Sequence, residues 1–343
     1  MKKINVLVAG STGFIGLQLI KLLVKHKYTN IKYLCGNSSV GRNIATYDQE
    51  LKIKTLPNIV KFKKEFLKNV DVVFSALPNG DAQNISKLLK KNNIMIDLSG
   101  DFRLRKLSDY KKWYKLKHKA RQNINKSIYV LPEITKEKIQ NYKIISCPGC
   151  YPTSILLALA PLIKKNLIKK NNIIIDSKSG YSGAGRGIYK RNKNKNLFES
   201  LSVYGISDHK HNPEINQELK KITNSKIIFS FTPHLIPMFK GILTNIYVDL
   251  NKKISIDDVI KQLKNFYKNS DFVKIMKKNS LISTNDVINT NYCKISVCRT
   301  NNKNKIIILK NIDNLIKGGA GQAIQNYNNY FNFNISEGLK WKL

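Results

Sequence analysis

Apolar and polar positions divide the first half of the chain into short strands and amphipathic helices. Apolar runs rich in β-branched residues predict strands at 4–9, 31–35, 70–76, 94–98 and 143–146. Helical periodicity predicts helices at 17–25 and 82–91, and an apolar helix that follows Pro152 and runs through Leu162. Strands that alternate with helices are typical of a parallel, doubly wound α/β sheet.

After residue 171 the apolar runs become longer or lie closer together. They predict strands at 173–177, 227–232, 243–250, 292–298 and 305–309, and a last helix at 322–330. This spacing is typical of a mixed sheet, so we expect a second, α+β domain. The length of 343 residues fits two domains.

A glycine-rich turn joins the first predicted strand to the first helix. Glycines there let the backbone approach a pyrophosphate, whose charge lies at the N-terminus of the following helix. The spacing is GxxGxxG rather than GxGxxG, so a plain tight turn is the alternative. Its place between strand and helix favours a Rossmann-type nucleotide site formed by Gly10, Ser11, Thr12, Gly13, Phe14, Ile15 and Gly16.

The segment after the second strand indicates which nicotinamide nucleotide binds. An NAD site usually has an Asp or Glu here to bind the ribose hydroxyls. Residues 35–42 contain no carboxylate and instead offer Ser38, Ser39 and Arg42. These groups suit a 2′-phosphate, so the sequence favours NADP(H) as the cofactor.

Composition excludes several classes of protein. Hydrophobic residues make up 42% of the chain, which excludes general disorder. The longest apolar stretch, 155–163, is far shorter than the ~20 residues of a membrane span. The start resembles a signal peptide, but three glycines break its apolar run and no cleavage site follows. Five cysteines are too few, and odd in number, for a disulfide framework, so we expect a cytoplasmic protein with no membrane partner.

The net charge of +38 invites a nucleic-acid interpretation. However, the charge is spread over the whole chain, and lysine supplies 53 of the 60 cations, whereas bidentate recognition of phosphate and guanine relies on arginine. We therefore expect lysines on solvated faces and no nucleic-acid partner. The alternative is a surface that attracts small anions through Arg42, Arg186 and the basic loop at 190–196.

Cys147 and Cys150 form a CxxC motif ahead of the apolar helix. A zinc site lacks a second CxxC, and thioredoxin-like redox pairs lie near the start of short chains, but both remain alternatives. We favour a single nucleophile, because a thiol at a helix start feels the positive end of the helix, which lowers its pKa. Cys150 is closer to the helix and is the better candidate.

His209 and His211 are the candidates for proton transfer with that cysteine. Their spacing suits metal ligands on a strand, but no third ligand is evident and Pro213 starts an apparent helix. We expect a general acid or base here and no metal, with a structural role as the alternative. His26, His118 and His234 read as surface or packing residues.

Small residues are dense in segment 179–186, which ends in Arg186, one of only seven arginines. Such a segment lies close to a ligand or is an ordinary flexible loop. The rarity of arginine favours the ligand interpretation.

Taken together, these motifs resemble those of the N-acetyl-γ-glutamyl-phosphate reductases, which belong to the aspartate-semialdehyde dehydrogenase superfamily. The resemblance runs from the first strand to the last helix. The most specific elements are Gly-Cys-Tyr-Pro-Thr at 149–153 and His-x-His-x-Pro-Glu-Ile at 209–215. The other matching segments are 10–16, 77–80, 97–103, 131–133, 182–186, 233–235, 241–243 and 319–326.

The resemblance implies an NADP-dependent reductase of arginine biosynthesis that converts an acyl phosphate to an aldehyde through a cysteine thioester. Cys150 matches the nucleophile and His211 the acid/base, with His209 as the alternative. The implied cofactor contacts beyond the glycine loop are Ser182, Gly183 and Asn326. The implied substrate contacts are Arg103, Arg186 and His209.

The resemblance also implies the domain boundaries. The NADP-binding domain would comprise 1–147 and 318–343, and a catalytic, dimerisation-type domain would comprise 148–317. A homo-oligomer, dimeric or tetrameric, is implied as well.

The chain departs from the family pattern at four positions. Cys147 stands where relatives usually have Asn, Asn79 where they have His, Gly100 where they have Ala, and Lys210 where they have Arg. None of these removes a catalytic group, and a reversible disulfide between Cys147 and Cys150 is an open alternative. Two other functions also remain open: a reductase of a carrier-linked aminoadipyl phosphate in lysine biosynthesis, and a basic nucleic-acid-binding protein with a vestigial Rossmann domain.

Overall fold

The computed structural model describes residues 3–53, 55–186, 199–223 and 225–340, and the basic loop expected at 190–196 lies outside the described residues. The chain divides into two compact units. Among the described residues, the first unit consists of 3–149 together with 319–340, and the second unit lies within residues 150–318.

The first unit contains a sheet whose neighbouring strands all run parallel. Across the sheet, the strands of the described residues follow the order β3 (Ile59–Val60), β2 (Thr29–Cys35), β1 (Ile4–Ala9), β4 (Val72–Ser75), β5 (Ile94–Asp97), β7 (Ile144–Ser146) and β6 (Ser127–Tyr129). The helices of this unit are α1 (Phe14–Lys25), α2 (Ala82–Ser86), α3 (Leu107–Tyr114) and α8 (Gly321–Tyr330). This order is that of a Rossmann-type, doubly wound fold, as the sequence predicted.

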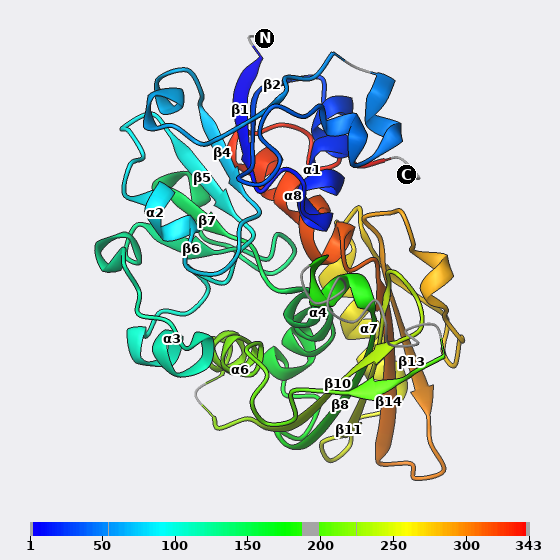
Figure 1. The fold of residues 1–343 in the computed structure, drawn as a ribbon. Helices are drawn as coiled ribbons and strands as arrows, with labels where there is room; N and C mark the ends of the chain where they lie inside the picture. The colour runs from blue at the N-terminus through cyan, green and yellow to red at the C-terminus, as the bar shows by residue number, and fades with distance from the viewer. Residues whose placement is uncertain (1–2, 54, 187–198, 224, 341–343) are drawn as a thin grey trace. The chain divides into compact units, whose positions relative to one another are not determined.

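Both faces of this sheet are covered. On one face α1 and α8 lie side by side (Figure 1), and the Tyr327 ring of α8 packs 5.6 Å from that of Phe74 in β4. On the other face Leu7 and Val73 pack with Ile85 of α2. Successive residues of a strand point to opposite faces of the sheet. Because both faces are covered here, the strands are apolar at consecutive positions.

The second unit contains a mixed sheet. Its strands within the described residues follow the order β12 (Val273–Ile275), β13 (Cys293–Arg299), β14 (Lys305–Ile312), β11 (Ile242–Asp249), β8 (Asn171–Gly180), β10 (Ile228–Ile236) and β9 (Ser202–Val203). The pairs β8/β10 and β12/β13 are parallel, and the other neighbours are antiparallel. The expected combination of a parallel sheet and a mixed sheet is therefore confirmed.

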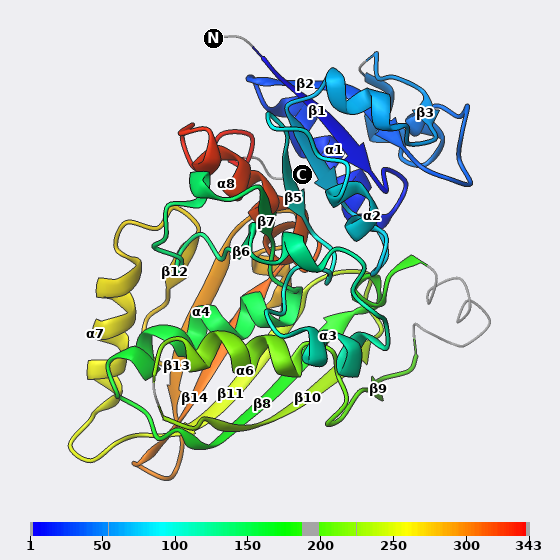
Figure 2. The ribbon, with the colours of Figure 1, turned by 90° about the vertical axis from the view of Figure 1, so that its left-hand side faces the viewer.

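Three helices, α4 (Cys150–Lys164), α6 (Asn212–Lys220) and α7 (Ile256–Tyr267), lie on one face of the mixed sheet (Figure 2). Nearly every residue of α4 after Cys150 is buried. Pro161 inside α4 has no N–H to donate to the carbonyl of Leu157. The hydroxyl of Tyr267, in α7, donates to that carbonyl instead, at 2.6 Å.

Three expectations about this fold were wrong in detail. Helix α2 ends at Ser86, whereas the predicted helix ran to residue 91. Helix α4 begins at Cys150 itself rather than after Pro152. Lysines do not all lie on solvated faces, because Lys21, Lys310 and Lys317 are buried. Ion pairs with Asp48 and Glu50, at 2.7 and 2.9 Å, offset the cost of burying Lys21. No helix within the described residues is long and apolar enough to cross a membrane.

Candidate active site

The glycine-rich turn after β1 is too tight for side chains at two of its positions. Gly10 has φ +82°, and a Cβ there would lie 2.4 Å from the carbonyl oxygen of Ala76. A Cβ on Gly16 would lie 2.2 Å from the oxygen of Gly10. A Cβ on Gly13, by contrast, meets nothing closer than 3.5 Å among the described residues. Gly10 and Gly16 therefore shape the turn, and Gly13 leaves space at the start of α1.

The turn is anchored to the end of β2. The carbonyl of Cys35 accepts hydrogen bonds from the backbone N–H groups of Gly10 and Ser11 and from the Ser11 hydroxyl, at 3.0 to 3.1 Å. Helix α1 has no acidic side chain in its first turn, and Thr12, Phe14 and Ile15 are partly exposed there. An anion can therefore approach the positive end of this helix, as a pyrophosphate site requires.

The segment after β2 lies beside this turn. Ser39 is buried, and its hydroxyl lies 3.5 Å from that of Thr12. The backbone of Gly41 and Arg42 pairs with Ile59 of β3, while the side chains of Ser38 and Arg42 are exposed. The segment thus has a fixed backbone and carries exposed groups that suit a phosphate.

Asn326 of α8 is completely buried in the first unit. Its Nδ2 donates to the carbonyl of Val130 at 3.2 Å and to the sulfur of Cys147 at 3.4 Å. Its Oδ1 is buried and has no hydrogen-bond partner among the described residues. A buried acceptor of this kind is costly unless a ligand or water donates to it, so the residue fits a bound cofactor.

The two cysteines of the CxxC motif differ in environment. Cys147 is buried at the end of β7, and burial raises the pKa of its thiol to about 12. Cys150 is partly exposed and is the first residue of α4. Neither takes part in a disulfide. A thiol that stays protonated is a poor nucleophile, so Cys150 is the reactive candidate of the pair.

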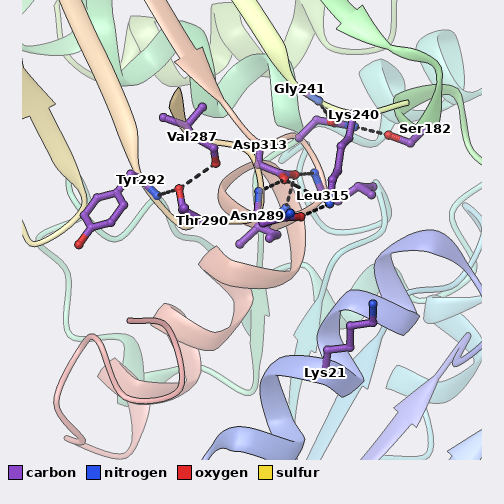
Figure 3. A network of polar contacts seen from close by, with 12 residues as sticks. Lys21, Ser182, Lys240, Gly241, Val287, Asn289, Thr290, Tyr292, Asp313 and Leu315 are labelled. Carbon is purple, nitrogen blue, oxygen red and sulfur yellow. Dashed lines mark hydrogen bonds and ion pairs between the residues drawn. The ribbon is translucent and has the colours of Figure 1, made fainter. Parts of the chain in front are cut away.

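A backbone loop after β14 lies against Cys150. A Cβ on Gly318 would lie 2.7 Å from the Cβ of Cys150, so only glycine fits here without displacement. Asp313, which is buried, holds this loop: its carboxylate accepts from the N–H groups of Leu315 and Asn289 at 2.9 Å, and its carbonyl accepts from Gly318 at 2.9 Å. Figure 3 shows the Asp313 carboxylate at the centre of the network, and the Nζ of Lys240 lies 3.9 Å from its Oδ2.

The rings of His209 and His211 both make edge-on contacts with the ring of Tyr151, the residue after Cys150. The ring centroids lie 5.6 and 5.9 Å from that of Tyr151, and 4.7 Å from each other. His209 is buried, and burial together with Lys210 lowers its pKa to about 4. Its Nδ1 accepts the backbone N–H of His211 at 3.1 Å. His209 is therefore a neutral imidazole with one nitrogen already engaged, and it orients the start of α6 where His211 lies.

Two tyrosines that the sequence reasoning missed belong to this cluster. The hydroxyl of Tyr204 donates to that of Tyr151 at 3.1 Å, and Tyr151 donates to the carbonyl of His234 at 3.2 Å. Burial raises the pKa of both phenols, and charge on Cys150 raises each further. Both hydroxyls are therefore protonated donors within electrostatic reach of the thiol. Tyr151 adjoins Cys150 in sequence, but no local signal marks Tyr204.

The loop that carries Ser182 and Gly183 is held from several sides within the second unit. The Ser182 N–H donates to Phe239 at 2.9 Å, and its hydroxyl accepts from Asn314 at 3.0 Å. A Cβ on Gly183 would lie 2.8 Å from the hydroxyl of Ser179. The loop is therefore tightly fitted at its start, and Arg186, at its end, is partly buried.

Arg103 lies in the first unit and is buried. Its Nε donates to the carbonyl of Cys147 at 2.9 Å and its Nη2 to that of Leu98 at 3.0 Å. These bonds tie together the ends of β5 and β7, so Arg103 has a structural role whether or not it also contacts a substrate. Among the described residues no group of three or more His, Cys, Asp or Glu side chains is arranged to hold a metal ion.

Two protein-family models and several solved structures are similar to this chain. Residues 5–142 match the semialdehyde dehydrogenase NAD binding domain, and residues 150–314 match the semialdehyde dehydrogenase dimerisation domain. The chain is also similar in fold to aspartate semialdehyde dehydrogenase II of Vibrio cholerae, with a TM-score of 0.71 at 16% identity, over 97% of this chain and 99% of that one. The corresponding Candida albicans enzyme with NADP gives a TM-score of 0.70 at 18% identity, over 96% and 99% of the two chains.

Closer relatives are similar along almost the whole chain. An N-acetyl-gamma-glutamyl-phosphate reductase of Brachyspira hyodysenteriae is 42% identical, over 98% of each chain. One from Clostridium botulinum is 40% identical, also over 98% of each. A probable chloroplastic N-acetyl-gamma-glutamyl-phosphate reductase of Arabidopsis thaliana is 39% identical, over 98% of this chain and 84% of its own. The chain therefore belongs to the semialdehyde dehydrogenase family of oxidoreductases, in the group of the N-acetyl-gamma-glutamyl-phosphate reductases.

Proposed function

We propose that the protein uses NADPH to reduce N-acetyl-glutamyl 5-phosphate to N-acetyl-glutamate 5-semialdehyde and phosphate, as a step of arginine biosynthesis. One observation carries the proposal: the partly exposed Cys150 is the first residue of a buried helix, and two imidazoles lie on the ring of the next residue. The relatives of nearly full length that bear this name support the choice of substrate.

In the proposed reaction the Cys150 thiolate attacks the carbonyl carbon of the acyl phosphate. The bond from that carbon to the phosphate oxygen breaks, and phosphate leaves with its electron pair, which gives a thioester on Cys150. The nicotinamide, when bound, supplies a hydride to the thioester carbon. The resulting thiohemiacetal on Cys150 collapses, which releases the aldehyde and regenerates the thiolate. Backbone N–H groups at the start of α4 stabilise the oxyanion.

We assign the proton transfers to His211. Its ring lies on that of Tyr151, close to the start of α4, and His209 is already engaged through Nδ1. A neutral His209 contributes by orienting His211 and by presenting its ring to the substrate. Tyr204 and Tyr151 supply hydroxyl donors at the same place.

The first unit is proposed to bind NADP(H). The space at Gly13, the open end of α1 and the exposed Ser38 and Arg42 fit its phosphates, and the buried Oδ1 of Asn326 fits a donor such as a carboxamide. In the second unit we assign Ser182 and Gly183 to the cofactor and Arg186 to the acyl phosphate. Arg103 of the first unit is assigned to the acyl phosphate as well.

We further propose that the protein is a homo-oligomer, a dimer or tetramer, and that it acts in the cytoplasm. The model matched by residues 150–314 is described as a dimerisation domain. The face of the mixed sheet opposite α4 leaves Leu243, Tyr247 and Leu309 partly exposed, as a surface between copies would be. Five cysteines without a disulfide fit a reducing compartment.

The reverse reaction provides the decisive test. With N-acetyl-glutamate 5-semialdehyde as substrate, NADP⁺ reduction should require inorganic phosphate, and arsenate should replace it. The same assay with NAD⁺ should be much slower. NADP⁺ reduction that proceeds equally well without phosphate would overturn the thioester route, and turnover confined to a carrier-linked aminoadipyl semialdehyde would overturn the choice of substrate.

A further inference from the structure

A row of buried polar side chains lies between α4 and the mixed sheet. Lys310 of β14, Thr244 of β11 and Ser177 of β8 are neighbours in register across three strands, and all three are completely buried. Ser154 of α4 joins them, since the Thr244 hydroxyl lies 2.9 Å from the hydroxyls of both Ser154 and Ser177. Burial of so many polar groups is costly unless they bind one another, and here they do.

Lys310 reaches the helix that carries the nucleophile. Its Nζ donates to the backbone carbonyl of Thr153 at 3.0 Å and to that of Ser154. These two residues follow Cys150 by three and four positions, which is about one helical turn. The amino group of Lys310 is therefore bound to the first turns of α4, about one turn along the helix from Cys150.

A positive charge on Lys310 would be electrostatically unfavourable here if no negative charge lay near it. A cation stabilises the C-terminal end of a helix, and near the N-terminal end it opposes the helix dipole. A charge buried in the interior is also costly compared with an apolar side chain of the same size. A nearby thiolate changes this balance, because attraction between opposite charges is much stronger in the interior than in water.

We propose that Lys310 is a positioning residue for the reaction: it fixes the first turns of α4 and, through its buried positive charge, favours the thiolate form of Cys150. This inference rests on the proposed function, because it deepens the part assigned to Cys150. Lys310 touches neither substrate nor cofactor in the proposal and acts only through the helix and its electric field.

The test measures alkylation of Cys150 by iodoacetamide across pH 5.5 to 9.5, with each modified cysteine identified by peptide mass spectrometry. Only the thiolate reacts, so the rate follows the thiolate fraction. In Lys310→Met we expect the rate at pH 6.5 to fall about tenfold, which corresponds to a pKa one unit higher, with the wild-type rate regained at high pH. Lys310→Gln, which retains an N–H donor without the charge, should behave like Lys310→Met. Lys310→Arg should remain within about threefold of wild type.

Two controls isolate the effect. Lys294→Met removes a charge from the neighbouring strand β13, whose lysine pairs with Asp286 rather than with α4, and it should leave Cys150 unchanged. Cys298, a partly exposed cysteine on β13, is an internal reference in every variant.

Equal rates at every pH in wild type and Lys310→Gln would overturn the inference. So would a loss in Lys310→Gln that persists undiminished at high pH, because that pattern means a displaced thiol rather than a missing charge. If Lys310→Met does not fold, Lys310→Gln and Lys310→Arg decide by the same criterion. Alkylation needs neither cofactor nor substrate, so failure here leaves the proposed reductase activity standing, and an inactive wild type leaves the alkylation result standing.

Discussion

Gly318 lies directly against Cys150, with space for a hydrogen atom but not for a methyl group between them. A Cβ on Gly318 would be 2.7 Å from the Cβ of Cys150 and 3.1 Å from its Cα. Gly318 follows β14, and its N–H donates to the carbonyl of the buried Asp313. The place of the thiol is therefore set by a segment that lies far from it in sequence.

We expect Gly318→Ala to reduce kcat by roughly 10- to 100-fold, because a displacement of about 1 Å at a reacting atom has an effect of this size. Steady-state kinetics with the acyl phosphate will measure it. The affinity for NADPH, followed by fluorescence, should stay within about twofold, since the glycine turn of the first unit is untouched. A kcat equal to that of wild type would show that the loop yields freely and does not position Cys150.

The same substitution at the two cysteines of the CxxC motif tests which of them is the nucleophile. Cys150→Ser should reduce turnover by more than about 1000-fold, because a serine hydroxyl is not activated at this place, while NADPH binding persists. Cys147→Ser should retain turnover within a few-fold, because burial raises the pKa of the Cys147 thiol to about 12 and a serine oxygen can still accept the hydrogen bond that Asn326 donates to the sulfur. The opposite ranking of the two variants would transfer the nucleophile to Cys147.

The same substitution at His209 and His211 tests which of them transfers the proton. His211→Asn should reduce kcat by about 100- to 10,000-fold, the usual contribution of an acid/base. His209→Asn should cost less, because the amide oxygen can still accept the backbone N–H of His211. The pKa of His209 is lowered to about 4, so the wild-type rate profile above pH 5 should show no inflection from this residue. An inflection near pH 6.5 that disappears in His209→Asn would contradict the assignment.

The side chain of Tyr114 leaves no space for a Cβ at Gly100. A Cβ there would lie 2.3 to 2.5 Å from atoms of the Tyr114 ring, which is buried and stacked on Tyr110. Gly100→Ala should therefore lower the free energy of unfolding by about 1–3 kcal/mol, as overpacking does. Combining it with Tyr114→Leu should make the Gly100→Ala change less costly, and urea unfolding of the four proteins in the cycle measures this. Additive effects of the two substitutions would show that they do not interact.

Asp97 gives a prediction about pH. Burial, and then the charge of Asp101, raise its pKa to about 7, so the folded protein retains a proton that the unfolded chain releases above pH ~4. Folded stability therefore falls as pH rises through this window, by about 1.4 kcal/mol per pH unit for one proton. Asp97→Asn removes this term, so its unfolding free energy relative to wild type should rise from pH 5 to pH 7. Parallel stability curves in urea would show that Asp97 is ionised throughout.

The sequence was sufficient to predict features that depend on local geometry. Strands β1 and β5 follow from apolar runs, and the glycine turn follows because no other residue fits at Gly10 and Gly16. Helix α7 was missed although Ser255 and Asp258 form a capping box at its start, a signal present in the sequence. The start of α4 was misplaced because the helix was expected only after Pro152, whereas proline is tolerated in the first turn of a helix and Pro152 lies there.

Features that depend on distant partners could not be predicted. Nothing near Lys310 in sequence indicates burial, because its acceptors, Thr153 and Ser154, precede it by more than 150 residues. Tyr204 has no local mark either, and it enters the candidate site only because Tyr151 is brought beside it. Periodicity describes one helix or strand at a time, whereas the surroundings of Lys310 and Tyr204 depend on side chains and carbonyls of other elements.

The discontinuous first unit has a consequence for synthesis. Its sheet is complete once β7 has been made, but α8, which covers one face and supplies Asn326, is translated after the whole of the second unit. Since domains generally fold as the chain emerges, the unit that begins first finishes last. Until then the nascent chain exposes the apolar face around Phe74 that Tyr327 will cover. Truncation just before α8 should therefore spare the second unit and leave the first one open to proteases and chaperones.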